Sequence, residues 1–579
     1  MKCGELMKKR LIDVAMGREK PDLILKGAKV LNVFTEKLEE KDVAVCDGMI
    51  AGLGVYDGDN VVDLRGKYLT PGLLDAHMHL ESTLLTPVQF ERVSLAHGTT
   101  GVICDPHEIA NVAGTDGIDY IMQLCEPLSM HIWFNMPSCV PACPLEESGE
   151  VLEAEDLAPY YDKPNVLGLA EVMNSVGVID ADEKLLRKIT DAQSKGGIVD
   201  GHAPFLSAKA LCAYAGAGVQ SDHECTNAQE AIEKISRGQW IMVREGTAAK
   251  NLDSLIPICT PPYCYRALFC TDDRHPEDLL NEGHIDNILR KVTAKGIHPA
   301  PAIKMATFNT ASYFGLKGYG AIAPGYHADF TVFSDFESFN VEQVYIDGRL
   351  VAENGKVTIQ KQDDLPDNPK ILHSFHMQEV TPEQLAIPKI RNFQRVIGLK
   401  KHELLTEDML IQPTEDGKKN GGINIERDIL KAAVFERHHN TGHVGVGFIH
   451  GYGLKSGAIA TSVAHDSHNL IVIGTNDEDI AAAANAVREM NGGLVVAEHG
   501  KILEALPLPI AGLMSDLPIE EVEARIYAMK AAAKKLGVSD DIDPFMTLAF
   551  VSLPVIPTLR LNGKGLIDVE HQQIIKVTF

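Results

Sequence analysis

Two histidines separated by one residue carry the first chemical signal in the sequence. Residues 71–79 form an apolar run that ends in His77 and His79. Because side chains alternate along a β-strand, residues two positions apart project from the same face. Both imidazoles could therefore bind one metal ion, although the same spacing also fits two unrelated histidines that are packed or exposed. The rest of the chain decides between these interpretations.

Further residues of metal-ligating types recur downstream, each at the end of a short apolar run. They are Glu171, His202, His223, Asp272 and Asp273. A single histidine more often has a structural role, but a shared position at the ends of such runs makes coincidence improbable. Four imidazoles and at least two carboxylates exceed what one divalent ion needs, and a carboxylate can bridge two ions. The set therefore favours a site for two metal ions.

Eight apolar runs, separated by helical-looking intervals, would position these residues. They are residues 73–79, 101–104, 131–136, 166–172, 197–202, 219–223, 240–243 and 267–271. Strands that alternate with helices are typical of a parallel (β/α)8 barrel of the TIM type, whose catalytic groups lie at the carboxyl ends of the strands. We therefore expect an α/β fold in which the candidate ligands meet at the mouth of a barrel.

The length of 579 residues exceeds what a single compact core accommodates. Short β segments between residues 22 and 69 return at 328–333 and 341–351, so two β-rich flanks could form one discontinuous β-sandwich domain. After residue 363, glycine-rich stretches alternate with apolar β runs and a helical pattern, which indicates another α/β domain. We expect residues 1–70, which begin with a helix, and residues 320–362 to form the β-sandwich domain. Residues 71–319 would form the barrel, and residues 363–579 the C-terminal α/β domain.

Composition restricts the class of partner. The 54 basic and 80 acidic residues give a net charge of −26, which argues against nucleic acid or an anionic membrane as the main partner. The eleven cysteines include no Cys-x-x-Cys pair, so we expect reduced thiols. No signal peptide is indicated, and the apolar run at 548–559 is too short to span a bilayer and contains two prolines. The expected protein is soluble and cytoplasmic.

The order of these motifs resembles a known family. The His-x-His run, a later bridging carboxylate, two single histidines and a late aspartate resemble the amidohydrolase superfamily of metal-dependent hydrolases and deaminases. Within it, several segments resemble the bacterial adenine deaminases, and the likeness extends from about residue 22 to the end. These segments are residues 81–83, 104–112, 244–251, 270–274, 438–442, 451–460 and 464–469. The resemblance implies hydrolytic deamination of adenine to hypoxanthine and ammonia in purine salvage, by a homo-oligomer with a small-molecule substrate.

The resemblance also implies a role for each candidate ligand. His77, His79 and Asp272 would hold one metal, His202 and His223 the second, and Glu171 would bridge them. Many relatives have a carboxylated lysine at the bridging position, so the glutamate here would need no bicarbonate. Histidine and carboxylate ligands suit zinc, manganese or iron, and the family favours manganese or iron.

Catalytic roles follow from what such a metal does. It activates water at neutral pH, and a carboxylate beside that water, for which Asp272 is the first candidate, can take its proton. His223 is expected beside the same water. Glu81 would lie on the same face as His79 if the strand persisted, where it could serve a ring nitrogen of the substrate; a helix cap or a salt-bridged loop residue is the alternative.

Four more residues are candidates for substrate binding. They are Ser82, His107, Glu108 and Glu245. All four follow expected strands and would face the barrel mouth. Glu245 could equally pair with Arg244 or Lys250 at the surface.

A second group of histidines lies near the C-terminus. It comprises His438, His439, His443, His465 and His468. Without the strand-end pattern of the first group, these residues favour closure of the active site or a subunit contact over a further metal site.

Two other functions remain open from the sequence. An amidohydrolase that acts on a cyclic amide or an N-acetyl sugar would use the same metals with a different pocket. A non-catalytic metal-binding scaffold would share the ligands but have no turnover.

Overall fold

The computed structural model describes residues 3–359, 361, 363–387, 390–400 and 404–579. Eight parallel strands form its central region, and helices lie between consecutive strands. The strands are β6 (Leu73–Met78), β7 (Thr99–Cys104), β8 (His131–Met136), β9 (Val166–Val172), β10 (Ile198–Gly201), β11 (Ser221–Asp222), β12 (Trp240–Arg244) and β13 (Ala267–Cys270). Each of the eight expected runs therefore contains a strand.

The central strands form two parallel sheets that approach each other at both ends. The orders are β10-β9-β8-β7-β6 and β11-β12-β13. Backbone hydrogen bonds join the first sheet to the second, from Asp272 N to His77 O (2.9 Å) and from Gln220 N to Val199 O (2.9 Å). The parallel strands consequently form one curled surface, and the carboxyl ends of β6 and β13 meet.

Burial explains why these segments are strands and why helices cover them. Every residue of β6, β7 and β13 is buried, as expected for a parallel sheet that is covered on both faces. The main helices of the region are α2 (Pro87–Ala96), α3 (His107–Cys125), α6 (Glu183–Ser194), α7 (Ala208–Gly216), α8 (Ala228–Ser236) and α11 (Ile285–Ala294). In α11, Ile285, Ile288, Leu289 and Val292 repeat at helical spacing and are buried.

A nine-stranded sheet flanks the central region. It contains strands that precede the central region in the sequence and strands that follow it. Its strands are β1 (Leu23–Asn32), β2 (Lys37–Cys46), β3 (Met49–Gly54), β4 (Val61–Asp63), β5 (Tyr68–Pro71), β14 (Phe330–Phe333), β15 (Val341–Ile346), β16 (Arg349–Glu353) and β17 (Lys356–Val357). β14 pairs antiparallel with β5, so the returning segment completes the sheet that the N-terminal segment began. Helix α1 (Cys3–Ala15) packs on this sheet through Val14.

The C-terminal region, from β18 onward, contains an eight-stranded sheet. In spatial order its strands are β19 (Thr406–Ile411), β18 (Gln394–Leu399), β21 (Val444–His450), β20 (Leu430–Phe435), β23 (Leu470–Gly474), β22 (Ala458–Thr461), β24 (Gly493–Glu498) and β25 (Lys501–Pro507). Helix α16 (Asp477–Glu489) packs Ile480, Ala484 and Val487 against it. Helices α17 (Ile519–Lys535) and α18 (Pro544–Phe550) precede a small sheet of β26 (Leu559–Asn562), β27 (Gly565–Asp568) and β28 (Gln573–Ile575).

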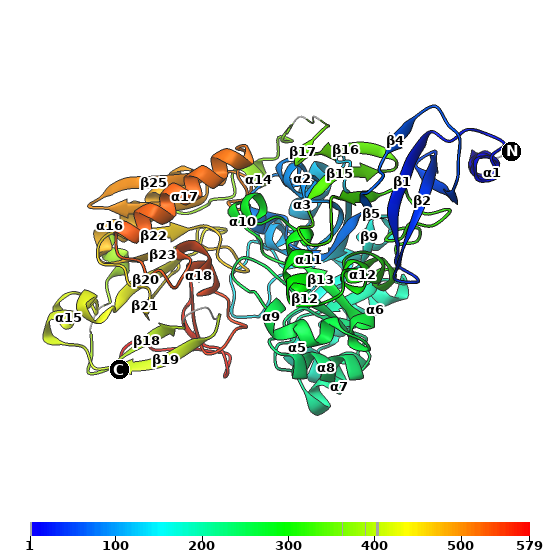
Figure 1. Cartoon of the computed structure of the whole chain (residues 1–579). Helices are drawn as coiled ribbons and strands as arrows, with labels where there is room; N and C mark the ends of the chain where they lie inside the picture. Colours follow the sequence, from blue (N-terminus) through cyan, green and yellow to red (C-terminus); the bar gives the residue numbers. More distant parts are fainter. Residues whose placement is uncertain (1–2, 360, 362, 388–389, 401–403) are drawn as a thin grey trace.

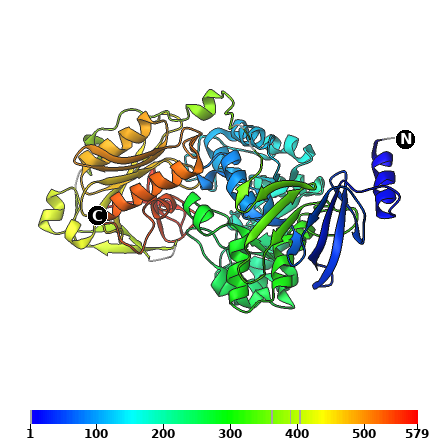
Figure 2. The same cartoon turned by 45° about the horizontal axis from the view of Figure 1, so that its top comes forward.

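The flanking sheet and the C-terminal region lie on opposite sides of the central region (Figures 1 and 2). The loop between β22 and β23 contacts the central region: Ser467 Oγ donates to Glu146 Oε1 (2.7 Å) and Asn469 Nδ2 donates to Glu147 O (2.8 Å). These contacts fix the loop beside the carboxyl ends of the parallel strands.

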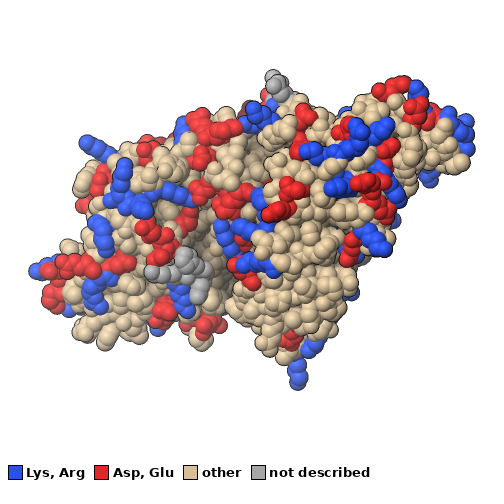
Figure 3. Space-filling view, viewed as in Figure 1, with Lys and Arg blue, Asp and Glu red and all other residues tan. Residues whose placement is uncertain are grey.

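The surface carries both signs of charge, interspersed over the face shown in Figure 3. Among the described residues, no helix is long and apolar enough to cross a membrane. The ten cysteines whose side chains the structure describes are free thiols.

Candidate metal centre and active site

The structure brings all six candidate ligands together around the Glu171 carboxylate. Its Oε1 lies 3.7 Å from His77 Nε2 and 3.4 Å from His79 Nε2. Its Oε2 lies 2.8 Å from His202 Nδ1 and 3.2 Å from His223 Nε2. The two oxygens of one carboxylate therefore face two separate histidine pairs, as a bridging ligand would.

Asp272 completes the first of these groups. Its Oδ1 lies 3.0 Å from His79 Nε2 and 3.7 Å from His77 Nε2. The residue follows β13 with a φ of +59°, in the left-handed region that a non-glycine residue rarely occupies. Surrounding hydrogen bonds to β6 hold this conformation, which turns the carboxylate toward the histidines.

The hydrogen bonds of the ring nitrogens fit metal binding. His79 Nδ1 lies 3.0 Å from Asp105 O, so this nitrogen carries the proton and leaves the Nε2 lone pair toward Glu171 and Asp272. His77 Nε2 is buried and has no hydrogen-bond partner among the described residues. Ligand atoms of His77, His79 and Asp272 lie within 4.8 Å of one another. The donor set therefore suits a divalent ion.

Sequence reasoning missed Arg244, which ends β12 and bridges the cluster's carboxylates. Its Nη1 donates to Asp272 Oδ2 and to Glu224 Oε1, while Nη2 donates to Glu224 Oε2 at 2.9 Å. Burial alone would raise the pKa of Asp272, but the Arg244 guanidinium outweighs it, and the pKa is well below its usual range. The strand-end rule that selected the other residues would also have selected Arg244.

Glu81 is near the cluster, but the strand does not reach it. β6 ends at Met78, and Glu81–Thr83 form a 3₁₀ turn, so the assumption of a continuing strand was wrong. Glu81 is only 2% exposed, and its Oε1 accepts from Ile109 N–H (3.0 Å). Its Oε2 and the Ser82 hydroxyl are buried without partners among the described residues. Burial raises the pKa of Glu81 to about 7.

His107 begins helix α3 and lies beside Glu171. Its Nδ1 is 2.9 Å from Asp105 Oδ2 and 3.6 Å from Glu171 Oε1. Its Nε2, at the other edge of the ring, is 3.5 Å from Glu108 Oε1. Asp105 was not predicted, yet it contacts both His79, through its carbonyl, and His107.

Glu108 contacts two histidines of the C-terminal region. His465 Nδ1 lies 2.7 Å from Glu108 Oε1, and His468 Nε2 contacts Glu108 Oε2. Ala464 N–H donates to His468 Nδ1 (3.2 Å), so the proton of the neutral ring is on Nε2 and is directed to Glu108. Burial lowers the pKa of His468 to about 4, whereas at His465 the Glu108 carboxylate outweighs burial and raises the pKa to about 9. Glu108 is therefore held between a protonated histidine, His465, and a neutral one, His468, an arrangement we call the histidine clamp.

Glu245 has a different partner from those considered. Its Oε1 pairs with Lys291 Nζ of α11 (2.9 Å) rather than with the side chain of Arg244 or Lys250. Because Glu245 is paired with Lys291, its predicted contact with the substrate stays a prediction.

Of the other C-terminal histidines, His439 and His443 contact the central region, whereas His438 contacts the β22–β23 loop of its own region. His438 Nε2 lies 2.7 Å from Ser467 O, and His439 Nε2 lies 3.1 Å from Ser148 O. His443 Nδ1 lies 2.6 Å from Glu147 Oε1. His439 and His443 thus join the two regions, and His438 supports the loop that carries Ser467.

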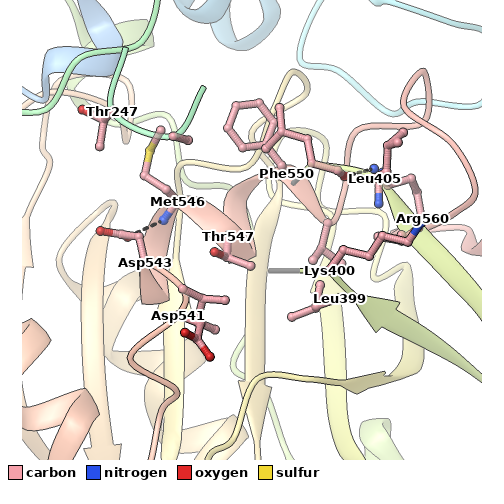
Figure 4. Close-up of a pocket in the computed structure, with 15 residues that line it drawn as sticks. Thr247, Leu399, Lys400, Leu405, Asp541, Asp543, Met546, Thr547, Phe550 and Arg560 are labelled. Carbon is pink, nitrogen blue, oxygen red and sulfur yellow. Dashed lines mark hydrogen bonds between the residues drawn. The ribbon is translucent and has the colours of Figure 1, made fainter. Parts of the chain in front are cut away.

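A pocket of about 140 Å³ lies at this boundary (Figure 4). Met546 and Phe550 of α18 line it together with Thr247 of the central region. The ring of Phe550 also stacks on His465, with centroids 4.4 Å apart. The pocket therefore adjoins the histidine clamp on Glu108, although its described lining includes none of the six candidate ligands.

Comparisons with known proteins match both halves of the chain. Residues 68–351 match the amidohydrolase family, and residues 403–573 match the adenine deaminase C-terminal domain. Adenine deaminase 2 of Carboxydothermus hydrogenoformans is 47% identical over 571 residues, which cover 98% of this chain and 99% of that protein. Adenine deaminase of Bacillus pumilus is 44% identical and covers 98% of both chains. Among solved structures, an enamidase aligns with a TM-score of 0.45 and 18% identity over 57% of this chain and 96% of that one. The near-complete coverage at this identity shows that the chain belongs to the adenine deaminase family of amidohydrolases.

Proposed function

We propose that the protein hydrolyses adenine to hypoxanthine and ammonia. The observation that carries this proposal is the 47% identity, over 98% of the chain, to a protein named adenine deaminase. The cluster around Glu171 supports a metal-dependent hydrolase that acts on a C–N bond.

We propose two divalent metals, with Glu171 as the bridging ligand. His77, His79 and Asp272 would hold one ion, and His202 and His223 the other. Manganese or iron is favoured, and zinc also suits this set of nitrogen and oxygen donors. When bound, such ions supply a Lewis acid that lowers the pKa of water from about 15.7 toward 7.

The protein's own side chains would move the protons of the reaction. Asp272 accepts a proton from the attacking water and returns it to the departing amine. His223 orients that water from the opposite side of Glu171. Glu81 donates to a ring nitrogen as C6 becomes tetrahedral, a role that its unpartnered Oε2 supports. Loss of ammonia, with return of the C6 hydroxyl proton to Glu81, then gives the C6 carbonyl of hypoxanthine and restores the aromatic ring.

Base recognition is proposed for neighbouring groups. Ser82 has a buried, unpartnered hydroxyl, and His107 presents its ring between Glu171 and Glu108. Glu108 would act through His107, because both of its oxygens already contact histidines. For Glu245, the Lys291 ion pair favours a role in positioning the loop after β12.

The finer architecture is part of the proposal. The curled parallel strands would close as a (β/α)8 barrel within residues 71–319. Residues 1–70 and 320–362 would form a β-sandwich, and residues 363–579 an α/β domain. A homo-oligomer that acts in cytoplasmic purine salvage is proposed on the family resemblance.

Activity and metal content can be measured on the same protein. Anaerobically purified enzyme should contain about two metal ions per subunit and release ammonia and hypoxanthine from adenine. The apoenzyme should regain activity with manganese or iron. Turnover of dihydropyrimidines or N-acetylated sugars without turnover of adenine would instead identify another amidohydrolase, and a metal-replete protein inert toward all of these would be a scaffold.

A further inference from the structure

The loop between β22 and β23 brings one carboxyl group to the candidate active site that no role yet explains. Five polar side chains of this loop make hydrogen bonds: Ser462 donates to Gly512 O, His465 and His468 contact Glu108, Ser467 contacts Glu146, and Asn469 contacts Glu147. Asp466 differs, because its Oδ1 reaches His107 Nε2 only at 4.0 Å. It is 2% exposed, and its Oδ2 has no hydrogen-bond partner among the described residues.

This arrangement fixes the position of Asp466. The residues before and after it are tied to the central region, so its backbone cannot turn the carboxyl group to solvent without breaking several buried contacts. A buried carboxyl oxygen without a hydrogen bond is costly, and such groups are retained where a ligand supplies the missing partner. Docking of the loop does not require Asp466, because its neighbours already make the docking contacts.

Asp466 faces the same histidine that lies beside Glu171. Asp466 Oδ1 is 4.0 Å from His107 Nε2, while His107 Nδ1 is 3.6 Å from Glu171 Oε1. One imidazole ring therefore separates Asp466 from the carboxylate at the centre of the ligand cluster. The two carboxyl groups thus approach the same imidazole from its two nitrogens.

A purine base would match these two groups at its two ends. Its reacting atom, C6, must lie beside Glu171 and Asp272, where water is activated. The five-membered ring then points away from the cluster, toward the C-terminal region. This ring carries an N–H donor at N9, and a carboxyl oxygen is the acceptor that such a donor requires.

We propose that Asp466 contacts the substrate, accepts the N9–H of the purine base, and thereby selects the free base over N9-substituted purines such as nucleosides. The inference deepens the proposed function and rests on it. The C-terminal region thus supplies a specificity-determining residue to a reaction whose chemistry takes place on the central region.

The test compares adenine with 9-methyladenine as substrates of the metal-loaded full-length enzyme. The wild type should prefer adenine strongly. Asp466→Leu removes the acceptor and keeps the branching of the side chain, so kcat/KM for adenine should fall about 10- to 100-fold, chiefly through KM, while 9-methyladenine is affected little. Asp466→Asn keeps one acceptor and should retain an intermediate preference.

Glu147→Gln provides the matched control. Glu147 lies at the same boundary and contacts His443, but it has no role in the proposed catalysis or binding, so its change should leave the preference for adenine intact. Equal losses for both substrates in Asp466→Leu, or an unchanged KM for adenine, would overturn the inference. A wild type that uses 9-methyladenine as well as adenine would overturn it without any variant. With any of these results, adenine turnover by the wild type would still support the proposed function. Absence of adenine turnover would contradict the proposed function as well as the role of Asp466.

Discussion

The central and C-terminal regions each present two or more histidines to a buried glutamate, yet the two clusters differ in the atoms that face it. At Glu171, the hydrogen bond from His79 Nδ1 to the Asp105 carbonyl leaves the Nε2 lone pair for a metal. At Glu108, the Ala464 N–H occupies His468 Nδ1, so Nε2 bears a proton and donates to the carboxylate. Both clusters place ligand atoms within 4.8 Å of one another, so the partner of the distant ring nitrogen, rather than residue type, distinguishes the candidate ligand set from the hydrogen-bonded histidines.

The largest effect should come from Asp272. Asp272→Asn removes the proposed base of the central cluster while keeping the shape of the side chain, so kcat/KM for adenine should fall about 1,000-fold. Ammonia release is the measurement, with metal content determined on the same sample. Activity within tenfold of the wild type would show that another group takes the proton from water.

Substitutions in the two clusters should differ in their effect on metal binding. His223→Ala should lower metal affinity by at least about 100-fold, whereas His468→Ala should leave the metal-to-protein ratio unchanged. Elemental analysis after dialysis against a weak chelator distinguishes these outcomes. Loss of an ion from His468→Ala would make the second cluster a metal site.

The clamp should affect turnover less than the ligands do. Glu108→Gln weakens its contacts with both C-terminal histidines and with His107, so kcat/KM for adenine should fall about 10- to 100-fold at full metal occupancy. His439→Gln, at the same boundary but in contact with Ser148 rather than with Glu108, is the control and should change activity by less than about twofold. A metal-deficient Glu108→Gln protein would contradict the division between the clusters.

The smallest effect concerns stability. Burial opposes the charge of His465, but Glu108 outweighs it and raises the pKa to about 9, above about 6.5 for an unfolded chain. A raised histidine pKa contributes stability below pH 6.5 that is lost as the pH rises through 9, on the order of 3 kcal/mol in total. His465→Gln should therefore lower the melting temperature by several degrees at pH 6.5 and very little at pH 9.5. A difference that is independent of pH would show that His465 is neutral.

The sequence predicted the central strands well because parallel strands are buried on both faces and read as continuous apolar runs. β8 and β9 match the expected residues at both ends. β11 is only two residues long, and β6 ends at Met78, one residue before the expected end at His79, because local backbone bonding ends both sooner than hydrophobicity suggests. Boundaries, rather than the existence of elements, were the weaker predictions.

The site shows the same limit. The six candidate ligands lie at the carboxyl ends of the central parallel strands or just after them, so position along the chain implied their proximity. The pairing of Glu108 with His465 joins residues 357 positions apart, on elements that no periodicity relates. Asp466 was likewise invisible as a site residue, because only the docked loop places it beside His107.

Synthesis of the chain separates the two clusters in time. Asp272 is the last of the six candidate ligands, and residue 466 emerges roughly 200 residues later, on the order of 10–40 s at typical translation rates of about 5–20 residues per second. During that interval the nascent chain contains every candidate ligand but no loop to cover them. The proposed metals can therefore bind before the loop that contacts Glu108 has been synthesised.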